Sequence, residues 1–159
     1  MGAGADQGTG VVLLEIYDTD TGPGRILNLS NRGYISGEST ALVGGFVISE
    51  EGPADLLIRA IGPGLIGHGL NGTLSDPRIT LYRIEPENDG ASTVILEGEN
   101  WGENDDRETT AQAAATAGAF SLPAESKDTA IAVRLPSGIY SVVVEGPPFH
   151  EGVALLEIY

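Results

Sequence analysis

The sequence has 159 residues, which fits one domain of ordinary size that can bury a substantial core. Its 23 acidic and 8 basic residues give a formal net charge of −15, so neither nucleic acid nor an anionic membrane is expected as a partner. The absence of cysteine excludes disulfides, thiol catalysis and thiolate metal sites. No apolar run reaches the roughly 20 residues of a membrane helix, so membrane insertion is not expected either.

Glycine and proline divide the chain into short apolar runs, a pattern typical of all-β domains. Glu108–Phe120, with six alanines, is the stretch predicted as a helix, with Ala113, Ala117 and Phe120 on one stripe. Many short strands and one short helix predict a β-sandwich of jelly-roll or immunoglobulin-like type, with the helix over one open end. The predicted strands are Val11–Tyr17, Arg25–Leu29, Leu42–Ser49, Asp55–Ile61, Arg78–Glu85, Ser92–Leu96, Thr129–Leu135, Ile139–Glu145 and Val153–Tyr159.

The two ends of the chain carry nearly the same octapeptide. Gly10–Tyr17 is GVVLLEIY and Gly152–Tyr159 is GVALLEIY, so seven of eight positions are identical. Nothing between the two copies repeats, and composition alone does not produce such a match. One face of such a strand is apolar and the other is apolar except for Glu15, so exposure costs about 1.5–3 kcal/mol per large apolar side chain and leaves an unpaired backbone edge.

The N-terminal copy is predicted to act as a donor strand. The C-terminal copy follows Ile139–Glu145 after a short connection, so we expect these two strands to form a local hairpin. The N-terminal copy precedes Asp18–Gly24, a polar Gly/Pro linker that can swing outward. We therefore predict that residues 10–17 add to the sheet of a neighbouring copy, in a head-to-tail contact that builds an open filament. The residues expected to make this contact are Val11, Val12, Leu13, Leu14, Ile16 and Tyr17.

This prediction divides the chain into an N-terminal extension, residues 1–24, and a β-sandwich domain, residues 25–159. Two alternatives remain open. In one, the chain is an excerpt of a longer tandem array, and the first octapeptide ends the preceding repeat. In the other, both octapeptides are strands within one monomeric sheet.

Several segments, taken in order, resemble a known type of domain. They resemble a β-rich repeat domain of roughly 140 residues from large secreted bacterial proteins, and the similar strand-donating subunits of extracellular glycoprotein fibrils. The resemblance implies a secreted structural protein located outside the cell, and it names no catalytic residue. Only one such domain is present, which favours assembly between separate chains over a tandem array. The segments are Arg25–Gly33, Gly45–Ile48, Leu57–Leu65, Asp76-Pro77, Leu81-Tyr82, Asn100–Gly102, Gly118–Leu122, Leu135–Tyr140 and Gly152–Tyr159.

The acidic loop Glu97–Asp106 is a candidate calcium site. It concentrates carboxylate and amide oxygens, which are the ligands that calcium prefers. The spacing is not that of an EF-hand loop, and the alternative is a solvated loop with Trp101 in the core. The candidate ligands are Glu99, Asn100, Asp105 and Asp106.

Two N-x-S/T sequons make Asn71 and Asn28 candidate glycosylation sites. Asn71 lies in a glycine-rich turn, where a bulky sugar fits. Asn28 lies inside a predicted strand, where backbone hydrogen bonding competes with modification.

No pattern in the sequence indicates catalysis, and the chain is predicted not to be an enzyme. Gly62–Gly67 matches the G-x-G-x-x-G pattern, but no helix can follow it to bind a pyrophosphate, so a glycine-rich loop is favoured. Apart from candidate calcium and covalent glycans, no cofactor is expected. The predicted function is that of a structural subunit of an extracellular fibril, with the chain itself as partner. The alternative is a monomeric or tandem-array calcium- or carbohydrate-binding module of a secreted surface protein.

Overall fold

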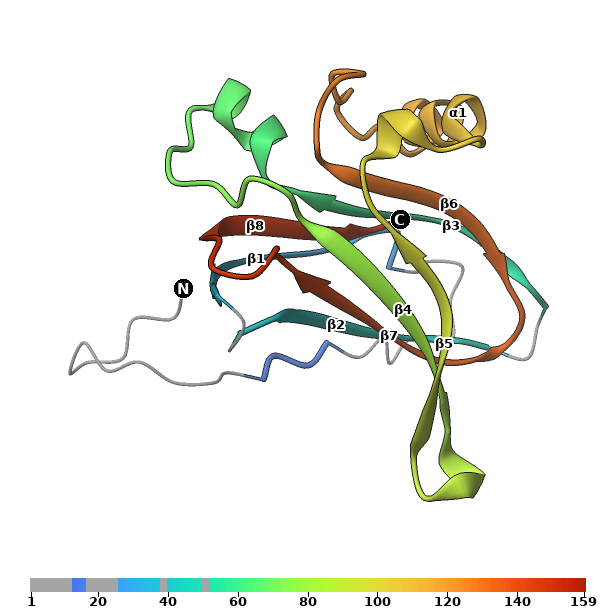
Figure 1. Ribbon diagram of the computed structural model, residues 1–159. Coiled ribbons are helices and arrows are strands. Elements are labelled where there is room, and N and C mark those ends of the chain that lie inside the picture. Colours follow the sequence, from blue (N-terminus) through green and yellow to red (C-terminus); the bar gives the residue numbers. More distant parts are fainter. Residues whose placement is uncertain (1–12, 17–25, 38–39, 50–51) are drawn as a thin grey trace.

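The structure is a computed structural model that describes residues 13–16, 26–37, 40–49 and 52–159. Two four-stranded antiparallel sheets pack face to face, which confirms the predicted β-sandwich (Figure 1). The strand order is β1-β8-β3-β6 in the first sheet and β2-β7-β4-β5 in the second. The strands are β1 Leu29–Ser36, β2 Leu42–Ile48, β3 Ala54–Ile61, β4 Arg78–Glu85, β5 Ala91–Gly98, β6 Thr129–Leu135, β7 Gly138–Glu145 and β8 Glu151–Ile158.

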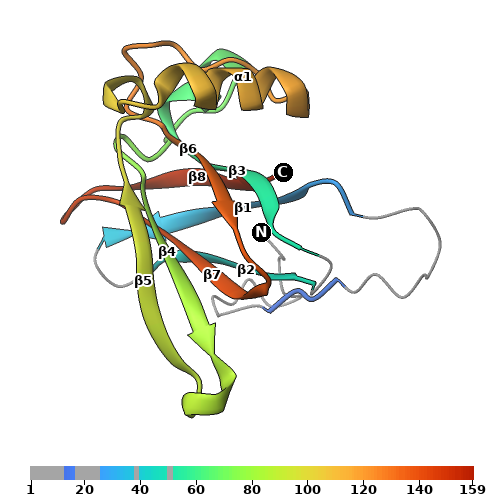
Figure 2. The same ribbon diagram turned by 90° about the vertical axis from the view of Figure 1, so that its right-hand side faces the viewer.

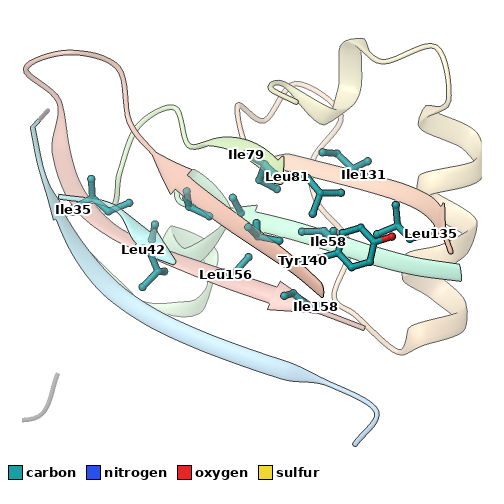
Figure 3. Packing of buried hydrophobic residues seen from close by; sticks show 14 of the residues in the cluster. Ile35, Leu42, Ile58, Ile79, Leu81, Ile131, Leu135, Tyr140, Leu156 and Ile158 are labelled. Carbon is teal, nitrogen blue, oxygen red and sulfur yellow. The ribbon is translucent and has the colours of Figure 1, made fainter. Parts of the chain in front are cut away.

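The core lies between the two sheets and consists of the inward-facing residues of alternating strands. In β7, for example, Tyr140, Val142 and Val144 are buried, and the residues between them face outward. The Tyr140 ring stacks on Phe46 of β2 at 5.3 Å, and its hydroxyl donates to the Pro136 carbonyl at 2.9 Å. Figure 3 shows the aliphatic residues of both sheets in this core, with Ile58 and Leu135 beside the Tyr140 ring.

The structure confirms most of the predicted strands, and two of them have the predicted bounds, β4 and β6. The strand predicted at Arg25–Leu29 is wrong, because β1 begins only at Leu29. Its pairing with β8 runs from Leu29 opposite Ile158 to Ser36 opposite Glu151. The polar residues of β1 gave no apolar run from which this strand could be predicted, so its position is decided by the partner strand.

The predicted hairpin between the strands now called β7 and β8 is also wrong. β7 lies in the second sheet and β8 in the first, so the five residues between Glu145 and Glu151 cross the sandwich. Beyond this crossing, Val153 forms a parallel bridge with Thr73. At Gly152 a Cβ atom would lie 2.4 Å from the backbone nitrogen of Leu74, so this close approach requires glycine.

The α-helix α1 spans Arg107–Ala117 and ends at Gly118, which adopts a left-handed conformation with φ 72°. The predicted helix therefore exists, but it ends three residues earlier than expected. Thr110 is its buried residue, whereas Ala117 is exposed, so the predicted stripe is also wrong. The helix lies on the outer face of the first sheet, next to β3 and β6, rather than over an open end (Figure 2). In the described part of the chain, no helix has the length and hydropathy needed to cross a membrane.

Candidate functional site: an exposed copy of a buried strand

The C-terminal octapeptide forms a strand inside the first sheet, because β8 pairs with β1 on one side and with β3 on the other. Its inward residues Ala154, Leu156 and Ile158 are 0%, 1% and 6% exposed. Beyond the end of β8, Tyr159 exchanges two backbone hydrogen bonds with Leu57, at 2.9 and 3.1 Å. This copy of the sequence therefore has partners on both faces and along both edges.

The outward face of β8 holds a buried ion pair. Arg59 of β3 lies opposite Glu157, and its Nε atom is 3.4 Å from the Glu157 carboxylate. The Arg59 guanidinium lies 4.4 Å from the centre of the Phe120 ring and donates to the Phe120 carbonyl at 2.9 Å. Burial lowers the pKa of Arg59, and the charge of Glu157 opposes that shift. Glu157 therefore helps to keep this buried arginine charged.

Tyr159 extends the same network. Its hydroxyl donates to Glu157 at 3.0 Å. Burial raises the pKa of the Tyr159 phenol, and the charge of Glu157 and this hydrogen bond act in the same direction. Arg59 and a hydrogen bond with Asn28 act in the opposite direction. The neutral phenol is therefore the form that the folded protein favours.

The described part of the N-terminal octapeptide, residues 13–16, has a different environment. Leu13, Leu14 and Ile16 belong to no strand and are 81%, 80% and 60% exposed. Their counterparts in β8 are Leu155, Leu156 and Ile158, of which the last two are buried. Val11, Val12 and Tyr17, also predicted to make the donor contact, lie outside the described residues.

The acidic loop does not gather its candidate ligands. Glu99 forms an ion pair with Arg78 at 3.1 Å, whereas Asp105 and Asp106 are exposed just before α1. The amide oxygen of Asn100 is buried without a hydrogen-bond partner. Among the described residues no group of three or more His, Asp or Glu side chains is placed to hold a metal ion. Calcium binding stays a prediction.

Trp101, in the middle of the acidic loop, is buried as expected for its core position. Its indole nitrogen donates to the Pro123 carbonyl at 3.0 Å. The side chain therefore fixes this loop to the segment that follows α1.

The glycine-rich loop after β3 binds a carboxylate of the protein itself. The backbone nitrogens of Gly62 and Gly64 donate to the buried Asp128 side chain at 2.7 and 2.9 Å. No α-helix follows, and Pro63–His68 forms a short 3₁₀ helix instead. Asp128 thus occupies the amides that a phosphate would need, and the loop joins the ends of β3 and β6.

Both sequon asparagines are exposed. Asn71 lies in the turn region between the 3₁₀ helix and β4, as expected. Asn28 precedes β1 rather than lying inside a strand, which corrects the sequence-based placement.

A cavity of about 160 Å³ lies between α1 and the first sheet. Alanines of α1 form much of its wall, and Arg59 and Thr110 contribute polar atoms. The Arg59 Nη2 and Thr110 Oγ1 atoms are buried without a hydrogen-bond partner. The sequence analysis did not identify Arg59, although a charged residue within the apolar run Leu56–Ile61 was a signal that could have pointed to it.

Comparison with known proteins adds limited information. No family model and no curated protein matches the sequence. Among solved structures, the fold is similar to the pre-peptidase C-terminal domain of a collagenase from Bacillus anthracis. The sequence identity is 13%, the TM-score is 0.48, and the match covers 84% of this chain and 90% of that chain. A similarity at this level assigns neither a family nor a function to the protein.

Proposed function

We propose that the protein is a structural subunit of an extracellular fibril, in which residues 10–17 of one copy join the sheet of a neighbouring copy. The observation that carries this proposal is the contrast between two nearly identical segments. Leu14 and Ile16 are 80% and 60% exposed, whereas the same residue types in β8 are 1% and 6% exposed.

Two physical arguments support strand donation. Burying the large apolar side chains of the N-terminal segment stabilises the assembly by about 1.5–3 kcal/mol per side chain. Pairing its backbone with an open sheet edge adds a ladder of hydrogen bonds. Because donor and acceptor are different surfaces, each subunit binds one neighbour with its tail and another with its body, and the assembly grows as a filament.

The proposed role is mechanical rather than catalytic, and it includes secretion and sugar attachment at Asn71 or Asn28. The extracellular location rests on the sequence resemblance, and the exposure of both asparagines supports their modification. Mass spectrometry of the protein isolated from its source checks the glycans, because each occupied site adds the mass of its sugar.

Deletion of Met1–Asp18 tests the proposal. No described strand begins before Leu29, so we expect the shortened chain to keep its far-UV circular dichroism spectrum and to stay monomeric. Negative-stain images should show fibrils for the full chain and none for the shortened one. Fibrils of normal appearance from the shortened chain would contradict strand donation.

A pair of point substitutions gives a control with matched exposure. Ile16 and Ile66 are 60% and 59% exposed, and only Ile16 lies in the proposed donor segment. Ile16→Asp should abolish fibrils because it places a charge in an apolar contact, at a cost of several kcal/mol. Ile66→Asp should leave fibrils unchanged.

A further inference from the structure

The sandwich has four edge strands in its described part, β1 and β6 in the first sheet and β2 and β5 in the second. An open edge presents unpaired backbone groups, and proteins usually protect it with charged side chains. β1 and β6 each contain an arginine and β5 contains a glutamate, in addition to hydroxyl side chains. β2, with the sequence LVGGFVI, contains no polar side chain.

We infer that the open edge of β2 is the acceptor for residues 10–17 of a second copy of this chain; the inference rests on the proposed function. β2 is seven residues long and pairs with β7 on its other side, from Leu42 opposite Val144 to Ile48 opposite Gly138. An eight-residue donor matches this length.

Both faces of β2 are apolar, which suits a donor strand with one apolar face and one mainly apolar face. Leu42, Phe46 and Ile48 face the core between the sheets. Val43 and Val47 face outward and are 54% and 71% exposed. Across the strand pair they lie opposite Val143 and Ile139 of β7, so they form one side of an apolar row on the outer face of the second sheet.

The orientation of the donor follows from its sequence. Val12, Leu14 and Ile16 share one face and are all apolar, so this face turns toward the core beside Leu42 and Ile48. The other face carries Glu15, which stays in contact with solvent, because α1 covers the first sheet and not the second (Figure 2). The same division holds in β8, where Leu156 and Ile158 turn inward and Glu157 turns outward.

In the same chain the described part of the donor segment, Leu13–Ile16, belongs to no strand and does not pair with this edge. Figures 1 and 2 both draw Leu13–Ile16, in blue, below β2 on the side away from the first sheet. Leu13, Leu14 and Ile16 are 81%, 80% and 60% exposed, so these apolar side chains are not buried against β2. Among the described residues no strand pairs with the outer side of β2, and a second copy is the occupant that extends the assembly.

Disulfide trapping tests the inference directly, since the protein has no cysteine of its own. A chain carrying Leu13→Cys is mixed with a chain carrying Val43→Cys or Val47→Cys, and the mixture is oxidised. Directly opposite residues on paired strands have Cβ atoms about 4.5–5.5 Å apart, close enough for a small shift to reach the roughly 3.5–4.5 Å of a disulfide. We expect a mixed dimer with at least one of the two β2 variants. Val94→Cys on the edge strand β5, where Val94 is 50% exposed, is the matched control and should give none.

A second variant blocks the edge. Val43 and Val47 are exposed, so replacing both with lysine should leave the fold intact. The two charges should abolish fibrils, because charged side chains on an edge strand prevent a further strand from pairing with it. Val94→Lys should leave fibrils unchanged. Circular dichroism shows whether each variant is folded, and sedimentation measures its monomer fraction.

The outcomes separate this inference from the proposed function. If the full chain forms no fibrils, or the chain without Met1–Asp18 still forms them, strand donation itself is wrong. If the tail is required but the two lysines on β2 leave fibrils unchanged, the acceptor is another edge. If a chain with both Leu13→Cys and Val47→Cys closes a disulfide within a monomer while mixed single variants do not, the segment docks on its own chain and the inference is overturned.

Discussion

At the scale of single residues, the Arg59–Glu157 pair links the side chains of β8 and its neighbour β3. Arg59 is 1% exposed, so its charge depends on a carboxylate that β8 supplies. A buried ion pair contributes little net stability when intact, but loss of one partner leaves an uncompensated charge. The pair therefore ties the position of β8 to that of β3.

Arg59→Leu should lower the free energy of unfolding by about 3–5 kcal/mol, because it leaves Glu157 without its counter-ion. Arg134→Leu is the control, since Arg134 pairs with Asp55 at 2.6 Å at the surface. That loss should be about 1 kcal/mol or less. Urea denaturation of the two variants measures both values, and equal effects would contradict the role of the buried pair.

The raised pKa of Tyr159 predicts a loss of stability in alkali. The folded state holds the phenol proton more tightly than the unfolded state does, so this contribution is complete below pH about 10 and disappears as pH rises through the folded pKa. Tyr159→Phe removes the titrating group and should flatten that decline. Denaturation curves at several pH values between about 8 and 11 measure it. A decline of the same slope in the phenylalanine variant would assign it to other groups.

At the scale of elements, sequence patterns were sufficient for the positions of most strands but not for that of β1 or for strand partners. Strands such as β4 and β6 are apolar runs between turn-forming residues, and local patterns define them. β1 is mostly polar and exposed, so only its pairing with β8 gives it strand conformation. The sheet to which β8 belongs depends on a crossing between sheets, which local patterns do not encode.

Of the two parts of the candidate site, one could be predicted from the sequence and the other could not. The repeated octapeptide is visible in the sequence, because identity between distant segments needs no structural knowledge. The open apolar edge of β2 is not visible there, because LVGGFVI would be equally suitable for a central strand. Only the strand order shows that nothing pairs with its outer side in the described structure.

At the scale of the whole molecule, the proposed assembly uses two different surfaces of the chain, the N-terminal tail and the β2 edge. The proposed filament is consequently polar, with free tails at one end and free β2 edges at the other. Growth at each end requires a subunit that carries both surfaces. A subunit with one surface can bind an end but cannot extend it.

This polarity predicts capping. The chain without Met1–Asp18 keeps the β2 edge, so it should bind the free tail at one end of a filament and stop growth there. Adding it in increasing proportion to the full chain should shorten the fibrils progressively, as measured from length distributions in negative-stain images. The shortened chain that also carries Val43→Lys and Val47→Lys has neither surface, so it is the control and should leave lengths unchanged. Unaltered fibril lengths with an equimolar amount of the first chain would contradict a head-to-tail filament. They would mean that a chain with an intact β2 edge does not bind the free tail at a filament end.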